Sequence, residues 1–334
     1  MAGKDTGTRM LSFRKELFSK YTNLFTFIAL VFVLAVFTKG RVLQGDSIRN
    51  LMIAESVRAF AALGVGMIII SRGIDLSIGY VVCLTASVAA SFAQTPGYSG
   101  ALFPGVQFPF WAPIVIGIAV GGLFGLLNGV LVAYAKLPPF IATLGSLSLA
   151  RGAQLIYTRA SVIGSLKQEF KEISQGNVGP IPNLAIYVVI ALVLIWILLR
   201  HTRLGTNFYA IGGNPQAARV SGVNVEADLV KVYFFAGLLY GIAGVLQASR
   251  LGLANALTAN GMELDAIAAV TVGGVSQSGG VGKVSGMILG VLIMGIINYG
   301  MTYLNIDSYY QLLMKGTIII VAVYFDMRKH ARKL

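Results

Sequence analysis

Charged residues are scarce in this chain of 334 residues, at 12% against 56% hydrophobic residues. Soluble domains carry about 25% charged residues, so the composition argues against a soluble fold. The single cysteine, Cys83, excludes an internal disulfide, and the two histidines, His201 and His330, are too far apart to give a metal-ligand spacing. No cluster of catalytic residue types is present either, so we expect no enzyme active site and no metal site.

What the sequence has in abundance is long apolar runs, many of which reach the length of about 20 residues that crosses a bilayer. They predict an all-α polytopic membrane protein with about ten transmembrane helices. Eight or nine is the alternative, because the run at 263–278 is short and broken by glycine. The predicted helices are 22–38, 49–70, 74–94, 110–134, 139–158, 182–200, 229–249, 263–278, 284–302 and 309–326.

These helices form a single predicted transmembrane domain, 22–326, between a basic segment, 1–21, and a basic tail, 327–334. No small-residue cleavage site follows the first apolar run, so we expect a retained helix and not a signal peptide. The net charge of +13 would suggest a nucleic-acid partner in a soluble protein. Here the basic residues flank apolar runs, so they indicate membrane orientation and no nucleic-acid partner.

Ten helices place the N-terminal segment, the stretch 200–231 and the tail on one face, which their basic residues mark as cytoplasmic. Both termini are therefore predicted to be cytoplasmic. The loop 95–109 falls on the opposite face and contains no Lys or Arg. Basic residues at 39–49 and 159–171 fit this orientation less well, because they would lie outside.

A weak internal repeat relates the stretch RGIDLSIG at 72–79 to GGVSQSGG at 273–280. Each ends one apolar run and begins another, and three of eight positions are identical. Duplicated halves are common in transporters, where glycine-broken helices at matching positions mark the transport path. The repeat predicts two weakly related halves, although so few identities in a glycine-rich chain are also compatible with chance.

The glycine-rich stretch 279–286 is not a phosphate-binding loop. A Walker A loop needs Ser or Thr directly after its lysine and Gly six residues before it. Val284 follows Lys283 here, and Gln277 occupies the glycine position. The chain therefore has no nucleotide site that we can identify.

The predicted cytoplasmic loop 201–228 contains the clearest local helix signals. Asn214 suits a helix N-cap, Pro215 the first helical position and Gly222 the helix end. They predict a helix of about seven residues, which is too short to be stable without packing partners. The residues leave open whether this helix is an interfacial connector or a surface on which another protein docks.

Polar residues inside the apolar runs are costly and suggest function. Glu55 and Arg58 stand three positions apart and could pair on one helix face. The other acidic candidates could be ion pairs, caps or residues of a transport pathway. The candidates for a pathway or gate are Asp75, Asn128, Gln154, Glu263, Asp265, Asn298 and Gln311.

Glycines at four-residue spacing predict close helix packing and say little about function. They are Gly117, Gly121, Gly125 and Gly129, and then Gly286 and Gly290.

Several motifs are distributed from about residue 45 to the end of the chain. They are GIDLSIG at 73–79, LPPFIATLG at 137–145, Ala-Arg-Gly at 150–152, TRLG at 202–205, AIGGNPQAARVSGVNV at 210–225, ELDAIAA at 263–269, VGGVS at 272–276 and the tail NYGMTYLNIDSYYQ at 298–311. In combination, these motifs resemble the membrane permease subunits of bacterial ABC importers for simple sugars, the ribose, xylose and galactose group. The tail is most similar to the galactose/methyl-galactoside branch.

The resemblance implies a multi-pass permease of the bacterial inner membrane that translocates a monosaccharide, galactose or a methyl-galactoside. It implies a second permease subunit as a homodimer partner, a periplasmic or lipoprotein sugar-binding protein, and a cytoplasmic ATPase that binds ATP and Mg on a separate chain. This chain would then carry no cofactor. The implied ATPase-coupling helix consists of Gly212, Gly213, Asn214, Pro215, Gln216, Ala217, Ala218, Arg219, Val220, Ser221 and Gly222.

Two alternatives stay open from the sequence. One is a permease for another monosaccharide, such as ribose or xylose. The other is an ion-coupled secondary transporter, which would favour carboxylates in mid-membrane as relays. Glu55, Asp75, Glu263 and Asp265 lie mostly near predicted helix ends, which weakens that alternative.

Overall fold

The computed structural model describes residues 22–331, so the predicted segment 1–21 and positions 332–334 of the tail lie outside the described residues. The chain is almost entirely helical. Its elements are the helix Thr22–Phe37, η1 (Arg41–Leu43), α2 (Gly45–Ile70), α3 (Ile78–Phe92), α4 (Ala112–Ala133), α5 (Pro139–Thr158), α6 (Gln168–Gln175), β1 (Asn177–Val178), β2 (Ile181–Pro182), α7 (Asn183–His201), α8 (Arg203–Gly213), α9 (Pro215–Val220), α10 (Val225–Leu251), α11 (Met262–Val272), α12 (Val284–Tyr303) and α13 (Ser308–Ala331).

Every predicted apolar run forms a helix, which confirms an all-α membrane fold. By length and composition, six helices of the described chain could cross a membrane, namely α2, α4, α7, α10, α12 and α13, while Thr22–Phe37 and α3 are shorter apolar helices. Two predicted boundaries were wrong. Residues 74–77 precede α3 as a nonhelical stretch, and α11 ends at Val272, before a glycine-containing turn, and not at 278.

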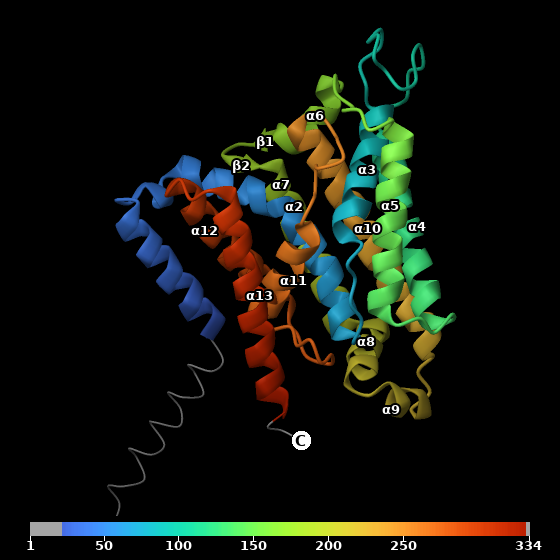
Figure 1. Ribbon diagram of the computed structural model, residues 1–334, viewed down its shortest axis with the longest axis vertical. Helices are drawn as coiled ribbons and strands as arrows, with labels where there is room; N and C mark the ends of the chain where they lie inside the picture. Colours follow the sequence, from blue (N-terminus) through green and yellow to red (C-terminus); the bar gives the residue numbers. More distant parts are fainter. Residues whose placement is uncertain (1–21, 332–334) are drawn as a thin grey trace, which may run out of the picture.

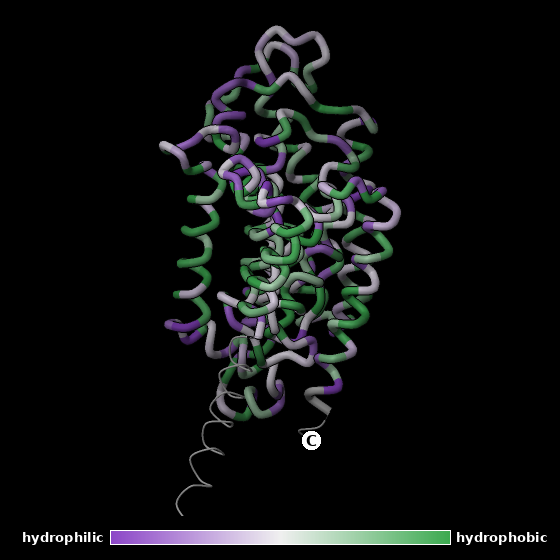
Figure 2. Tube along the Cα trace, turned by 90° about the vertical axis from the view of Figure 1, so that its left-hand side faces the viewer, coloured by the Kyte–Doolittle hydropathy of each residue, from purple (hydrophilic) through white to green (hydrophobic). Residues whose placement is uncertain are grey.

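The helices lie roughly side by side, and their connections gather at two ends (Figure 1). The lower end carries α8, α9, the start of Thr22–Phe37 and the end of α13, as the predicted topology requires of segments on one side. The upper end carries α6, the β1–β2 hairpin and the loop between α3 and α4. Hydrophobic residues dominate the helices between these ends, while many hydrophilic residues lie towards the loops (Figure 2). That the lower end is cytoplasmic stays a prediction.

Helix α10 lies at the centre of the core and packs on α2, α3 and α4. The predicted glycine packing is confirmed at the contact between α4 and α10. A Cβ atom at Gly121 would lie 2.4 Å from the Gly237 carbonyl oxygen, and one at Gly125 would lie 2.3 Å from that of Tyr233. Backbone meets backbone there, so only glycine fits without moving a helix.

Besides η1, three short features were not predicted, namely α6, the β1–β2 hairpin and α8. The loop 159–181 contains α6 and, with Pro182, the β1–β2 hairpin, and the loop 201–228 contains α8 before α9. Helix α6 is amphipathic with only Phe170 and Ser174 buried. It is too short and too polar to stand out in a search for spanning runs.

Candidate functional site

Helix α9 is the short helix predicted between two spans, and its cap is as predicted. The Asn214 side chain accepts hydrogen bonds from the backbone N–H groups of Gln216 and Ala217, each at 3.0 Å. Pro215 occupies the first helical position, and the chain leaves the helix through Ser221 and Gly222, whose φ is +88°. The helix spans six residues, close to the predicted length.

Gly212 and Gly213, which we predicted as part of the same helix, belong instead to the end of α8. Helix α8 begins at an N-cap residue, Thr202, whose hydroxyl oxygen accepts a hydrogen bond from the Gly205 N–H at 3.1 Å. Threonine is a favoured N-cap residue, so Thr202 was the signal in the sequence that could have revealed α8. The segment predicted to couple to an ATPase therefore comprises the end of α8 and all of α9, with the extended residue Asn214 between them.

The two faces of α9 differ in burial. Ala218 is only 4% exposed and packs in a small apolar cluster with Ile211 and Val225. Ala217 points outward, and Val220 on the same short helix is 90% exposed. One face therefore fixes α9 to the protein, while the other presents an apolar side chain beyond the bundle.

An ion triad connects α9 to the neighbouring spans. The Glu226 carboxylate, in the first turn of α10, contacts Arg219 of α9 and lies 2.8 Å from the Lys136 ammonium, which follows α4. All three side chains are partly exposed, so each pair contributes at most about 1 kcal/mol. Their effect is mainly to fix the orientation of α9 relative to α4 and α10.

Gly212 lies where α8 meets the spans, and the contact is made of backbone. A Cβ atom at Gly212 would lie 1.8 Å from the Ile70 carbonyl oxygen and 2.4 Å from the Gly280 nitrogen. Those two groups also share a hydrogen bond, Gly280 N–H to Ile70 O, at 2.8 Å. The end of α2 and the loop between α11 and α12 thus meet at the end of α8.

Residues 72–77 of the first similar stretch and all of the second, 273–280, lie in helix breaks, and the two stretches touch each other at this junction. A Cβ atom at Gly279 would lie 2.8 Å from that of Arg72 and 2.7 Å from the Gly212 carbonyl oxygen. Nearby, the Tyr209 hydroxyl of α8 donates to the Gly282 carbonyl at 2.9 Å, and partial burial raises the pKa of this phenol. Movement of α8 would therefore reach both breaks directly.

Two predicted pathway residues, Asp75 and Asn128, are brought together in a buried network. The Asp75 carboxylate accepts hydrogen bonds from the Ser77 N–H at 2.8 Å and from its hydroxyl at 2.6 Å. The Asn128 amide of α4 donates to the same hydroxyl at 3.0 Å, and Ser146 of α5 donates to the Asn128 side-chain oxygen. The network connects the break before α3 to α4 and α5.

The predicted pair Glu55–Arg58 is confirmed, and it extends to two further charges. The Arg58 guanidinium lies 3.5 Å from the Asp265 carboxylate, which also lies 2.9 Å from the Lys315 ammonium. Glu55 and Asp265 are 4% and 8% exposed. This charged cluster joins α2, α11 and α13, and Lys315 was missed because it is 50 positions from Asp265.

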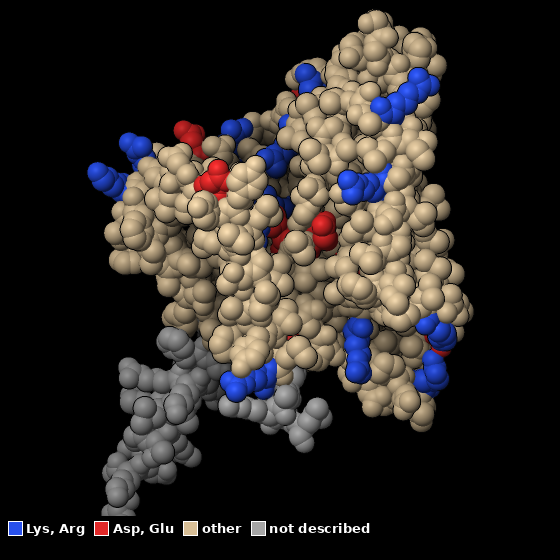
Figure 3. Space-filling view, in the orientation of Figure 1, with Lys and Arg blue, Asp and Glu red and all other residues tan. Residues whose placement is uncertain are grey.

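A polar cavity of about 100 Å³ lies beside the charged cluster, between α2, α10 and α11, and is lined in part by Arg58, Gln247, Arg250, Asn260 and Asp265. Among the described residues, the buried side-chain oxygen of Gln247 has no hydrogen-bond partner. The face seen in Figure 3 is hollowed near mid-height, where both acidic and basic atoms are visible. The cavity offers both hydrogen-bond donors and a free acceptor.

The other predicted pathway residues are scattered. Gln154 is buried and donates to the Ser87 hydroxyl at 3.2 Å, and the Glu263 carboxylate lies against Gly79. Asn298 has a buried side-chain amide without a partner among the described residues, while Gln311 donates only to the Ile306 carbonyl at 2.9 Å. The structure therefore does not join the seven candidates into one continuous path.

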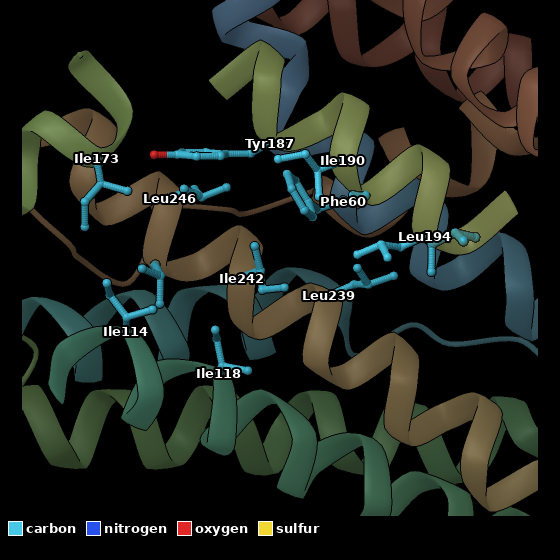
Figure 4. A pocket seen from close by; sticks show the side chains of 13 residues that line it. Phe60, Ile114, Ile118, Ile173, Tyr187, Ile190, Leu194, Leu239, Ile242 and Leu246 are labelled. Atoms are coloured by element: carbon cyan, nitrogen blue, oxygen red, sulfur yellow. The ribbon is translucent and has the colours of Figure 1, made fainter. Parts of the chain in front are cut away.

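A second cavity, of about 390 Å³, lies between α4, α7 and α10 and has an apolar wall (Figure 4). Phe60, Ile118, Leu194 and Leu239 are among its lining side chains, and Tyr187 carries the only polar side-chain atom. A sugar would lose its hydrogen bonds to water there and regain almost none. This cavity suits hydrocarbon better than it suits a polar solute.

Comparison with known proteins gives consistent relatives. A family model described as branched-chain amino acid transport system / permease component matches residues 47–323. The chain is 43% identical to the galactose/methyl galactoside import permease protein MglC of Haemophilus influenzae, over 85% of this chain and 87% of that protein. It is 39% identical to MglC of Escherichia coli, over 97% and 100%, and 38% identical to the ribose import permease protein RbsC of Bacillus subtilis, over 86% and 87%. No solved structure matches the chain.

Proposed function

Since the chain belongs to the family of branched-chain amino acid transport system permease components, we propose that it is the membrane permease subunit of an ATP-driven sugar importer. Its relatives are named as import permeases for galactose and methyl galactoside, and for ribose at lower identity. Galactose or a methyl galactoside is therefore the proposed substrate, and ribose is the second candidate. The proposed location is the bacterial cytoplasmic membrane.

In this proposal α9 is where a separate ATPase chain, which binds ATP and Mg, docks on the permease. The observation that carries it is the exposure of Val220, because 90% of an apolar side chain is left in water on a helix that is capped and fixed on its other face. The fully buried core of a protein interface is more apolar than the rest of the surface, so Val220 would lie in the core of such an interface. ATP-driven movement of α9 would pass through α8 to the junction at Gly212.

For the sugar we propose a contact site in the polar cavity that Arg58, Gln247 and Arg250 line. A monosaccharide is neutral and rich in hydroxyl groups, each able to donate and accept a hydrogen bond. The unpartnered oxygen of Gln247 would accept from such a hydroxyl, and the guanidinium groups would donate to others. In the conformation described, the cavity is too small for a hexose, so the sugar would enter only when α2, α10 and α11 separate.

The remaining proposed partners are a second copy of this chain and an extracytoplasmic sugar-binding protein. Helix α13 supports the second copy, because no residue in its apolar window of 18 residues is fully buried within one subunit. The binding protein would deliver sugar at the end of the bundle that carries α6 and the β1–β2 hairpin, opposite α9.

The proposed function is tested by uptake of labelled galactose into proteoliposomes that contain the permease with and without its ATPase and binding protein. We expect uptake only with both partners and ATP. Uptake by the permease alone, driven by a proton or sodium gradient, would instead assign it to ion-coupled transporters. Labelled ribose in the same vesicles separates the two sugar candidates.

The docking role of α9 is tested with Ala217→Asp and Val220→Asp. Both place a carboxylate on the outward face, so we expect the ATPase to stop co-purifying while the permease still inserts. Ala218→Asp is unsuitable for this purpose, because it would bury a charge and destabilise α9 itself. The matched control is Val178→Asp in the hairpin at the other end, where valine is 64% exposed. Unchanged association in the α9 variants would count against docking.

A further inference from the structure

A third cavity, of about 600 Å³, lies at the α9 end of the bundle, between the last turn of α7, helix α8 and the start of α12. Unlike the apolar cavity of Figure 4, it has a mixed lining with hydroxyl and basic groups. Its lining residues are Trp196, Leu199, Arg200, Thr206, Tyr209, Gly282, Lys283, Val284 and Ser285. No role assigned above to α8 or α12 uses this space.

The cavity carries positive charge that no carboxylate among its lining residues compensates. Arg200 and Lys283 approach it from two different helix ends, and neither forms an ion pair with any residue that the structure describes. Two cationic side chains that line one cavity, with no carboxylate in its lining, favour an anionic ligand. Ser285 adds a hydroxyl donor to the lining, whereas the Thr206 hydroxyl already donates to the Thr202 carbonyl at 3.2 Å.

The position of the cavity next to exposed apolar residues of α7 indicates what kind of anion could bind in it. Trp196 lies in the last turns of the apolar helix α7 and is 50% exposed. Tryptophan is enriched where hydrocarbon meets the headgroup region. Val193 and Ile197, seven and three positions before Arg200 on the same helical face, are 49% and 42% exposed. An apolar stripe thus leads along α7 to a basic cavity.

We propose that this cavity binds the phosphate of an anionic phospholipid, whose acyl chains lie along the exposed face of α7. Basic pockets between transmembrane helices are suited to such headgroups. Free phosphate would use the same cations but not the apolar stripe. An acidic segment of the ATPase is disfavoured because Trp196 and the stripe lie on the membrane side of the cations.

The lipid would also act on coupling. The Tyr209 hydroxyl in the cavity wall donates to the Gly282 carbonyl, so α8 and the loop between α11 and α12 form two sides of the same cavity. A bound headgroup that contacts Arg200 and Lys283 together would keep these sides in contact. Anionic lipid should therefore raise sugar-stimulated ATP hydrolysis by the assembled transporter.

The test uses the complete transporter, permease with its ATPase, in detergent. Native mass spectrometry would measure binding of phosphatidylglycerol, with phosphatidylcholine and inorganic phosphate as the other probes. We expect phosphatidylglycerol to bind at least tenfold more tightly than phosphatidylcholine. The double variant Arg200→Gln, Lys283→Gln should lose this preference, and Lys283→Arg should keep it. Arg328→Gln, which removes an exposed cation at the same end outside the cavity, should not change it.

The proposal is overturned if the double variant binds phosphatidylglycerol as well as the unaltered protein does. It is also overturned if inorganic phosphate displaces the lipid at equal concentration, since the apolar stripe would then contribute nothing. A crosslinker can also be attached to the cysteine of the variant Lys283→Cys. If it reacts with the ATPase and not with lipid, the cavity binds the protein partner and the proposal is overturned. If the double variant fails to insert, the single variants Arg200→Gln and Lys283→Gln are scored by the same criterion.

Discussion

Replacing Gly212 with alanine should separate sugar transport from ATP hydrolysis, because the added methyl group falls on a backbone junction. The new Cβ would stand 1.8 Å from the Ile70 carbonyl oxygen, whereas ordinary contact begins at about 3.4 Å. Both neighbouring groups are backbone, so neither can rotate away. Helix α8 must therefore move off the end of α2, or the hydrogen bond between Gly280 and Ile70 must break.

The magnitude follows from these two alternatives. Overpacking a dense contact costs roughly 1–3 kcal/mol, and if the hydrogen bond breaks as well, the unpaired backbone group costs about a further 1–3 kcal/mol. Alanine recovers up to about 1 kcal/mol through its higher helix propensity. We therefore expect the permease to lose up to roughly 5 kcal/mol of stability, with the strain concentrated at the contact between α8 and the end of α2.

The matched control is Gly213→Ala. It makes the same change one position later in α8, but its Cβ meets no atom within 4 Å. Thermal unfolding of the purified permease, galactose uptake and ATP hydrolysis in proteoliposomes would be compared for both variants. Gly212→Ala should unfold at a lower temperature and import less sugar per ATP, with the ATPase still bound. Equal behaviour of the two variants would refute the junction as the route of coupling.

Three further predictions concern the membrane-embedded contacts. Asp265→Asn should destabilise the permease by about 3–5 kcal/mol, because Lys315 loses its carboxylate partner in a buried cluster. The double variant Asp265→Asn, Lys315→Met should recover much of this loss when thermal unfolding is measured. No recovery would mean that the two residues are not energetically coupled. Asn128→Leu should cost about 1–2 kcal/mol by removing the bond to the Ser77 hydroxyl, and an unchanged unfolding temperature would contradict the network. Gly125→Ala should lower the unfolding temperature by forcing α4 from α10, whereas Gly145→Ala, which meets no atom within 4 Å, should not; equal shifts would argue against the glycine contact.

Much of the fold could be predicted from the sequence because hydrophobic length is a local property. Each apolar run specifies its own helix, whatever it packs against. The cap of α9 was equally local, since Asn214, Pro215 and Gly222 act on backbone groups within a few residues. Helix α8 was missed although Thr202 carried its signal, because a polar helix between two spans has no apolar run to mark it.

The candidate sites were less predictable because they join residues that are far apart in the chain. Asp265 was chosen for its charge, but its partner Lys315 lies 50 positions away, and no local pattern relates the two. The junction at Gly212 is harder still, because it consists of backbone groups from three segments and has no side-chain signature. The hydrogen bond from Asn128 to Ser77 likewise joins residues 51 positions apart, so no local pattern predicts it.

The division of α9 into a buried and an exposed face has a consequence for engineering. Ala218 fixes the helix to its own subunit, while Ala217 and Val220 are free to vary without disturbing that attachment. If α9 is the docking site, the residues that contact the partner are different from the residue that attaches the helix to the fold. Substituting Ala217 and Val220, with Asn214 and Ala218 retained, should make the permease bind a different ATPase. Two such transporters could then work in the same cell, each with its own ATPase.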